Sequence, residues 1–288
     1  MIKVSGGTKV CALIGCPVEH SLSPAMHNAA FQHLGLDYIY VAFNVPPERL
    51  GDAVLGIKGL GIYGVNVTMP HKINVIKYLD ELDEGARLAG SVNTILNRGE
   101  KLVGYTTDGL GALRALRHAG VDPAGRKVVI LGAGGASRAI CFALANHVRE
   151  LIILNRTLER AVKLADELRR VFSFVGVRAG LLSDNVLEDV LKDTDILINA
   201  TSVGMKPNIN ETPVKRELLH GNLTVFDIVY EPLETRLLKE AKSVGARTVD
   251  GLWMLVYQGA LSFEIWTGAK APVEVMREAA LKRLGEKE

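Results

Sequence analysis

The chain has 288 residues, of which 48% are hydrophobic and 23% charged, a composition typical of a globular protein large enough for two domains. The formal net charge of +2 gives no reason to expect nucleic acid or a membrane surface as a partner. Three scattered cysteines fit neither a disulfide framework nor a metal site and favour the cytoplasm, and no apolar run reaches the ~18 residues of a membrane span.

The first part of the chain alternates apolar runs with helical patterns, which is typical of α/β architecture. Strands are predicted at residues 10–14, 38–43, 62–67, 92–96 and 102–105, and helices at residues 24–34, 47–55, 73–79, 83–89 and 108–118. Polar residues lie at the ends of these strands, namely Asn66, Thr68, Asn93, Thr94 and Asp108. Because ligands of open α/β sheets bind beyond the carboxyl ends of the strands, these residues predict a cleft.

Residues 127–157 form the most informative stretch, a predicted strand–helix–strand unit. A β-branched run at residues 128–131 is followed by a glycine-rich loop, a helical pattern at 138–147 and an apolar run at 151–154. The loop consists of Gly132, Ala133, Gly134, Gly135, Ala136 and Ser137. Glycine turns tightly there and lets a pyrophosphate approach the N–H groups at the helix start. Although Ser137 replaces the third glycine of the Rossmann fingerprint, the whole unit favours dinucleotide binding over a plain tight turn.

The end of the second strand of this unit indicates which dinucleotide binds. An NAD site places Asp or Glu there to accept from the ribose 2′-OH, whereas this chain has Asn155, Arg156 and Thr157, with Arg160 following. A guanidinium forms a paired, charge-assisted contact with a 2′-phosphate. We therefore expect NADP. The alternative interpretation is that Arg156 is a solvated loop residue and Thr157 only caps the next helix.

The rest of the chain continues the alternation and then becomes helical. A helix is predicted at residues 158–170, strands near 173–177 and at 195–199, 224–227 and 246–249, a helix at 235–244, and final helices at 252–266 and 272–284. We predict an N-terminal α/β substrate-binding and catalytic domain at residues 1–108 and a Rossmann-type, doubly wound NADP domain at residues 109–250. The C-terminal helices at residues 251–288 are expected to return to the first domain.

Nine short motifs in order, from residue 10 to residue 260, resemble those of the shikimate dehydrogenase family. They lie at residues 15–24, 66–72, 91–94, 107–109, 132–137, 155–157, 199–202, 250–251 and 257–260. The family comprises NADP-dependent enzymes that reduce 3-dehydroshikimate to shikimate in aromatic amino-acid biosynthesis. Each motif alone is modest, and together they cover nearly the whole chain. Ser137 is normal for the glycine loop of this family.

The resemblance implies a set of site residues. The two serines that hold the substrate carboxylate correspond to Ser21 and Ser23, and the catalytic pair to Lys72 and Asp108, which also contact the substrate. The remaining substrate-binding residues correspond to Asn66, Thr68, Asn93, Tyr230 and Gln258. Beyond the glycine loop and residues 155–160, the cofactor is expected to contact Thr201, Ser202, Gly251 and Met254.

The chemistry fits these residues. Oxidising a secondary alcohol sends a hydride to the cofactor, while a side chain takes the proton from oxygen. We expect Lys72 to be this acid/base and Asp108 to position both the lysine and the substrate. The alternatives without a functional role are that Lys72 is a solvated lysine and that Asp108 and Ser23 each only cap a helix. Gln258 as a satisfied buried amide and Met254 as packing are further alternatives. His71 is expected to be exposed.

Other functions stay open at this point. One is a quinate/shikimate dehydrogenase of broader specificity, which often uses NAD, and another is a non-catalytic relative that senses NADP or a metabolite. A metal ion, nucleic acid and a membrane are not expected as partners. The sequence leaves the oligomeric state open, with a homodimer as one alternative.

Overall fold

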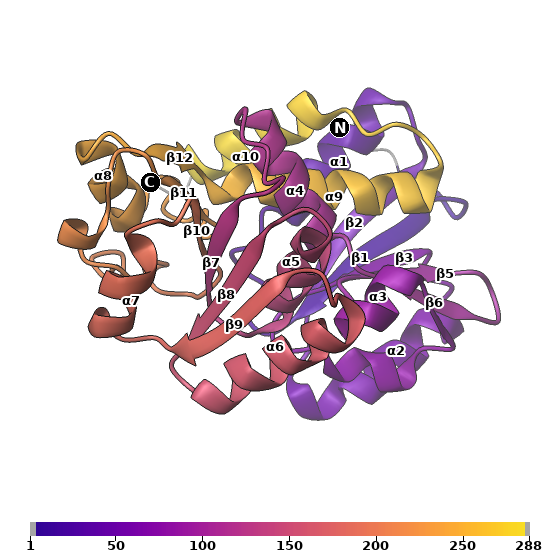
Figure 1. Ribbon diagram of the computed structural model, residues 1–288. Helices are drawn as coiled ribbons and strands as arrows, with labels where there is room; N and C mark the ends of the chain where they lie inside the picture. Colours follow the sequence, from indigo (N-terminus) through magenta and orange to yellow (C-terminus); the bar gives the residue numbers. More distant parts are fainter. Residues whose placement is uncertain (1–3, 286–288) are drawn as a thin grey trace. The chain divides into compact units, whose positions relative to one another are not determined.

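The computed structural model describes residues 4–285 and has α/β architecture (Figure 1). The chain divides into two compact units. Unit 1 comprises residues 1–107 and 256–288, and unit 2 comprises residues 108–255. The second crossing between units falls inside helix α9 (Gly251–Thr267), so the last part of the chain belongs to the same unit as the first. No helix among the described residues is long and apolar enough to cross a membrane.

Unit 1 contains a mixed sheet in the order β2-β1-β3-β5-β6-β4. Its strands are β1 (Lys9–Gly15), β2 (Tyr38–Asn44), β3 (Gly64–Val67), β4 (Glu81–Leu82), β5 (Thr94–Asn97) and β6 (Leu102–Tyr105). Its helices are α1 (Ser23–His33), α2 (Leu50–Gly59), α3 (Glu84–Ala89), most of α9, and α10 (Val273–Gly285), with short 3₁₀ helices at Pro47–Arg49 and Asn74–Tyr78. β1 runs parallel to β2 and β3, whereas β5 runs antiparallel to β3 and β6.

The antiparallel β5 corrects one prediction. Asn93 and Thr94 lie at the start of this strand and not at its carboxyl end. Thr94 pairs with Asn66 of β3 on one side and with Tyr105 of β6 on the other. The start of β5 therefore meets the carboxyl ends of β3 and β6. Asn66, Asn93 and Thr94 therefore still lie together at one end of the strands.

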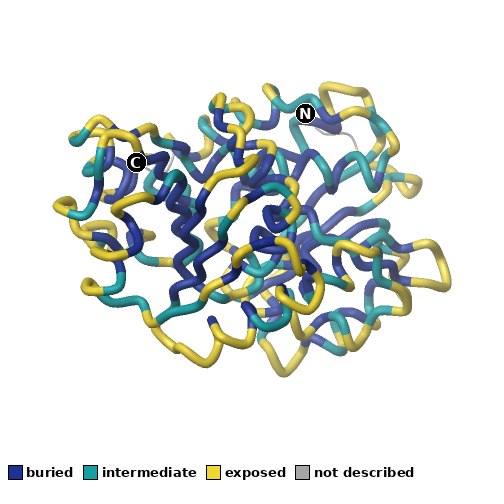
Figure 2. Tube along the Cα trace, viewed as in Figure 1, coloured by how far each residue is buried: buried dark blue, intermediate teal, exposed yellow. Residues whose placement is uncertain are grey.

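Two layers cover the sheet of unit 1. On one side, valine and isoleucine side chains of β1, β3 and β5 pack against α2. Helix α9 lies against β3 and β5, because the Trp266 Nε1–H donates to the Ile95 carbonyl at 3.0 Å. Gly64 of β3 makes room for this indole, which a Cβ at that position would overlap. Figure 2 shows the strands as largely buried, with exposed positions concentrated at turns and on outer helix faces.

Unit 2 contains a parallel sheet in the order β12-β11-β10-β7-β8-β9. The strands are β7 (Lys127–Leu131), β8 (Glu150–Asn155), β9 (Gly176–Leu181), β10 (Ile196–Asn199), β11 (Thr224–Asp227) and β12 (Arg247–Val249). The helices are α4 (Asp108–His118), α5 (Gly135–Ala145), α6 (Leu158–Val171), α7 (Asp184–Leu191) and α8 (Arg236–Ser243), with a 3₁₀ turn at Arg216–Leu218. This strand order confirms the predicted Rossmann-type, doubly wound sheet, with its switch point between β7 and β10.

Several predicted elements differ from the observed ones. The helix predicted at residues 73–79 is a 3₁₀ helix, and the strand predicted near 173–177 is found at Gly176–Leu181. The helix predicted from residue 138 begins at Gly135, so the second half of the glycine loop is already helical. The short strand β4 and helix α7 have no predicted counterpart.

Candidate functional site

The loops after β1 and β3 are joined by backbone hydrogen bonds. The Thr68 N–H donates to the Ile14 carbonyl, and the Cys16 N–H donates to the Met69 carbonyl, both at 2.9 Å. Thr68 is half-buried beside the end of β1. This connection places the residues 66–72 motif next to the loop that leads to the two candidate serines.

The candidate carboxylate-binding serines lie at the start of α1. Ser21 is half-buried, Ser23 is buried, and the Ser21 Oγ accepts from the Ser23 N–H at 3.2 Å. The N-cap position of α1 is Leu22, without a side-chain hydrogen bond, and Ser23 is the first helical residue. The alternative in which Ser23 only caps the helix is therefore wrong.

The Asn66 carboxamide is buried in a hydrogen-bond network. Its Oδ1 accepts from the Tyr40 hydroxyl at 2.8 Å. Its Nδ2 lies within donor distance of three oxygens: the Asn93 carbonyl at 3.1 Å, Thr94 Oγ1 at 3.2 Å and Ser262 Oγ at 2.9 Å. A carboxamide held at both ends has a fixed orientation, which a substrate-binding group needs.

Asn93 extends the network towards α9. Its Nδ2 donates to Thr107 Oγ1 at 2.8 Å and to Gln258 Oε1 at 3.0 Å, and its Oδ1 accepts from the Thr107 N–H at 2.7 Å. Gln258 is half-buried, and its side-chain oxygen accepts a hydrogen bond from Asn93. The alternative that Gln258 is an amide with its hydrogen bonds satisfied within the protein therefore holds for this oxygen. Both asparagines and Gln258 thus come together in unit 1.

Lys72 lies in the turn between β3 and the 3₁₀ helix of residues 74–78, and is half-buried. Its carbonyl accepts from the Val92 N–H at 2.8 Å, which joins this turn to the segment before Asn93. The neighbouring His71 is buried, and its Nε2 lies 2.7 Å from the Val45 carbonyl. The prediction that His71 is exposed is therefore wrong.

The other two candidate polar residues belong to unit 2. Asp108 is the first residue of α4 and is buried, and Tyr230 is half-buried in the loop after β11. Burial, with the adjacent Glu231, raises the pKa of Tyr230 to about 12. The phenol is consequently protonated at neutral pH and able to donate a hydrogen bond.

The glycine loop of unit 2 follows β7. Gly132 has φ +107°, and a Cβ there would lie 2.9 Å from the Ala200 carbonyl. Ser137 is fully buried, and its hydroxyl donates to the Gly132 carbonyl at 2.6 Å. Ser137 therefore closes the loop with a hydrogen bond. Gly134 is exposed at the N-cap of α5, so the first N–H groups of that helix, which have no intrahelical acceptor, fit a diphosphate.

The residues expected to discriminate NADP from NAD lie at the end of β8. Arg156, Thr157 and Arg160 are exposed, and the Asn155 Nδ2 donates to the Thr157 carbonyl at 2.9 Å. Among residues 4–285, neither of these arginines forms an ion pair. Thr157 occupies the N-cap position of α6 without a side-chain hydrogen bond, so its hydroxyl does not cap the helix as the alternative proposed.

A second network, which no sequence motif predicted, centres on Asp227 at the end of β11. Its Oδ1 accepts from Asn199 Nδ2 at 2.9 Å and from the Val229 N–H at 3.0 Å, and its Oδ2 accepts from the Thr235 hydroxyl at 2.7 Å. Burial raises the pKa of Asp227 to about 6. Asn199 Oδ1 in turn accepts from the Thr201 hydroxyl at 2.7 Å. The network shapes the loops that carry Thr201, Ser202 and Tyr230.

The last cofactor candidates lie at the start of α9. Gly251 is buried as its first residue, and Met254 is also buried.

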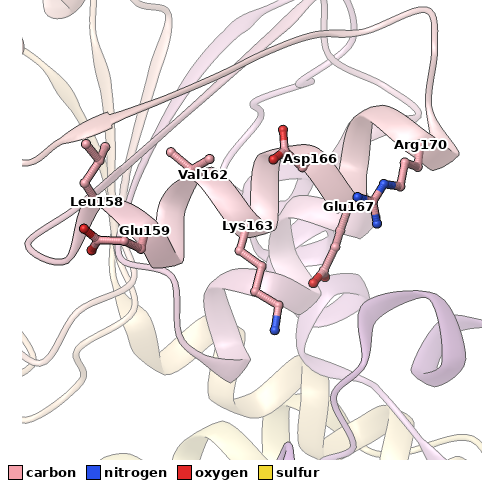
Figure 3. Close-up of a pocket in the computed structure, with 7 residues that line it drawn as sticks. All are labelled: Leu158, Glu159, Val162, Lys163, Asp166, Glu167 and Arg170. Carbon is pink, nitrogen blue, oxygen red and sulfur yellow. The ribbon is translucent and has the colours of Figure 1, made fainter.

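The surface depression in Figure 3 does not coincide with any candidate residue. It is lined by side chains of α6 alone: Leu158, Glu159, Val162, Lys163, Asp166, Glu167 and Arg170. We therefore do not assign it to substrate or cofactor.

Comparison with known proteins gives consistent matches over the whole chain. Residues 13–95 match the family model of the shikimate dehydrogenase substrate binding domain, residues 115–252 that of shikimate / quinate 5-dehydrogenase, and residues 251–281 that of the shikimate 5'-dehydrogenase C-terminal domain. A shikimate dehydrogenase (NADP(+)) of Methanopyrus kandleri is 55% identical over 289 residues, which cover 98% of this chain and 98% of that protein.

Solved structures of shikimate dehydrogenases also match this chain over nearly its full length. A crystal structure of a shikimate dehydrogenase in complex with NADP+ has a TM-score of 0.92 and 49% identity, and the match covers 98% of each chain. The shikimate 5-dehydrogenase of Thermus thermophilus, in complex with NADP(H) and shikimate, has a TM-score of 0.87 and 38% identity. That match covers 96% of this chain and 100% of the other.

Proposed function

The chain belongs to the shikimate dehydrogenase family, and from this premise we propose that it interconverts 3-dehydroshikimate and shikimate with NADP, a step of aromatic amino-acid biosynthesis. The observation that carries the proposal is the 55% identity over nearly the full length of an NADP-dependent relative. It is supported by the buried asparagine network of unit 1 and the glycine loop of unit 2.

The proposed reaction needs a hydride acceptor and a proton acceptor. NADP, held by the loop of residues 132–137, would be the hydride acceptor when bound. We assign the second to Lys72, which takes the proton from the carbinol oxygen and returns it when the ketone is reduced. Asp108 is assigned to accept from the substrate hydroxyl.

The substrate is held by neutral groups for the most part. Ser21 and Ser23 solvate the carboxylate of shikimate through their hydroxyls, without the strong attraction of an arginine. The ring hydroxyls are assigned to Asn66, Thr68, Asn93, Tyr230 and Gln258. The fixed carboxamides of Asn66 and Asn93 support this assignment, because their orientation is set before a ligand arrives.

The cofactor is assigned to unit 2. The loop from Gly132 to Ser137 receives the diphosphate, and Arg156, with Asn155, Thr157 and Arg160 around it, receives the 2′-phosphate. Thr201, Ser202, Gly251 and Met254 are assigned to the nicotinamide half. Arg156 is exposed and residues 155–157 contain no Asp or Glu, which supports NADP over NAD.

We also infer a cytoplasmic location and a homodimer. No disulfide joins Cys11, Cys16 or Cys141, which fits a reducing compartment. Light scattering at two protein concentrations tests the dimer.

A single assay tests the proposed function. The purified protein is mixed with shikimate or quinate and with NADP or NAD, and absorbance at 340 nm is followed. NADPH formation with shikimate is the expected result. Comparable rates with quinate and NAD would instead identify the broader quinate/shikimate dehydrogenase, and absence of turnover with all four pairs would identify a non-catalytic relative.

A further inference from the structure

Three side chains on one face of α9 make polar contacts with the sheet of unit 1. Gln258, Ser262 and Trp266 are spaced four residues apart, so they lie above one another on the helix surface. Gln258 accepts from Asn93, and Trp266 donates to the Ile95 carbonyl. Ser262 lies between them and is fully buried.

Ser262 is the centre of this row. Its Oγ lies 2.9 Å from Asn66 Nδ2, 2.7 Å from Thr94 Oγ1 and 3.0 Å from the Gln258 carbonyl. Asn66 Nδ2 is a donor, so the serine oxygen accepts from it, while the serine proton goes to the Gln258 carbonyl or to Thr94 Oγ1. One hydroxyl therefore connects α9 with β3 and β5.

The hydroxyl has a consequence for Asn66. A carboxamide turned by 180° would point its oxygen at the Asn93 carbonyl, which is also an acceptor. Ser262 adds a second interaction that favours the observed orientation, and Tyr40 adds a third at the other end. Without Ser262, the amide loses one of the acceptors that keep it in place.

The hydroxyl also has a consequence for Gln258. Because Ser262 is one helical turn beyond Gln258, any shift of α9 along the strand edge at Ser262 moves Gln258 as well. Trp266, seated over Gly64, fixes the helix two turns from Gln258. Ser262 fixes it one turn away, nearest to the candidate substrate residues.

We propose that Ser262 is a positioning residue for substrate binding, which orients Asn66 directly and sets the position of Gln258 through α9. The proposal rests on the function proposed above. Ser262 itself is buried within the network and acts through these two residues.

The test is the Ser262→Ala variant, which removes only the hydroxyl. We expect KM for shikimate to rise about 3- to 10-fold, as for a lost hydrogen bond of typical strength, with kcat within about twofold of wild type. KM for NADP should stay unchanged, because the cofactor residues lie in unit 2.

Thr267→Val is the matched control. The Thr267 hydroxyl lies on the same helix and donates to the Phe263 carbonyl at 2.8 Å, as the Ser262 hydroxyl does to the Gln258 carbonyl. It also accepts from the Ala269 N–H at 3.1 Å, and within the described residues it has no hydrogen bond to Asn66 or Asn93. This variant should leave both KM values unchanged. In an Asn66→Ala background, Ser262→Ala should raise KM for shikimate by a smaller factor than in wild type, because the Asn66 carboxamide that Ser262 orients is already absent.

The outcomes separate the two proposals. If wild type oxidises shikimate and Ser262→Ala keeps the wild-type KM for it, the positioning role is overturned and the function stands. Equal rises in KM for shikimate and NADP would also overturn it, since general loosening of the protein gives that pattern. A wild type that does not oxidise shikimate overturns the proposed function itself.

Discussion

His27 is a fully buried imidazole inside an aromatic cluster. It stacks on Tyr40 with ring centroids 4.4 Å apart, and the rings of Phe31, Phe263 and Trp266 surround it. Within the described residues neither of its ring nitrogens has a hydrogen-bond partner. Burial without a partner penalises the charged form and lowers the pKa of His27 to about 3.

This histidine makes unit 1 sensitive to acid. Below pH 6.5 the unfolded chain binds a proton that the folded state excludes, so the free energy of unfolding falls as the pH drops towards 3. Between pH 7.5 and 4.5 the contribution amounts to roughly 3 kcal/mol. His27→Leu should lose this dependence. The free energy of unfolding is measured in urea in a Trp253→Phe background, where Trp266 alone reports on unit 1. Identical pH slopes for the two proteins would contradict the prediction.

Lys72 is the residue to which we assign proton transfer. Lys72→Ala should lower kcat by about 100-fold or more, the usual size of an acid/base contribution, while the dissociation constant of NADP stays unchanged. Lys77→Ala is the control, because Lys77 is an exposed lysine of the same segment that lies over the Tyr78 ring. Near-normal turnover in Lys72→Ala would remove the assignment.

At the scale of elements, a side chain of α1 covers part of the outer edge of strand β2. β2 is the terminal strand of its sheet, and the outer backbone groups of Tyr40 are satisfied by Asn28 of α1. The Asn28 Nδ2 donates to the Tyr40 carbonyl at 2.9 Å, and its Oδ1 accepts from the Tyr40 N–H at 2.8 Å. One asparagine thus takes the place of a neighbouring strand, which shields the edge against pairing with other chains.

Removing this cover should destabilise unit 1. Asn28→Ala leaves both Tyr40 backbone groups without their partner, and we expect a loss of about 2 kcal/mol in the free energy of unfolding, with more aggregation on heating. Gln32→Ala, at an exposed position of the same helix, should stay within about 0.5 kcal/mol of wild type. A loss of equal size in both variants would contradict this explanation, because alanine raises the helix propensity at both positions.

Elements were predictable where burial imposed a simple pattern. β7 and β8 are central strands with nearly continuous apolar runs, and these runs predict both strands and the glycine loop between them. β9 is an edge strand whose sequence alternates weakly, and the apolar run before it contains the exposed Phe174. The predicted exposure of His71 is wrong because it assumed a helix at this position, where neighbouring side chains face different ways, whereas His71 lies in a turn. Contacts such as Ser262 with Asn66 join residues 196 positions apart, which no local pattern indicates.

At the scale of the molecule, the residues proposed for the substrate carboxylate and for the 2′-phosphate of the cofactor belong to different compact units. Ser21 and Ser23 belong to unit 1 and Arg156 to unit 2. Arg156→Ala should raise KM for NADP by about 10-fold or more and leave KM for NAD unchanged, because a paired charge-assisted contact is lost only with the phosphorylated cofactor. Equal losses with both cofactors would refute the assignment.

The same division predicts how substitutions combine. Ser21→Ala should raise KM for shikimate without changing KM for NADP, and Arg156→Ala should do the reverse. The two residues share no partner and belong to separate units, so their free-energy effects on kcat/KM should add. The fold-change in kcat/KM of the double variant should then equal the product of the two single fold-changes within about twofold. The four proteins are compared in one 340 nm assay with each substrate varied in turn. A double variant that deviates by tenfold or more would show that binding of one ligand depends on binding of the other, because only coupling between the units can make effects on different ligands depart from additivity.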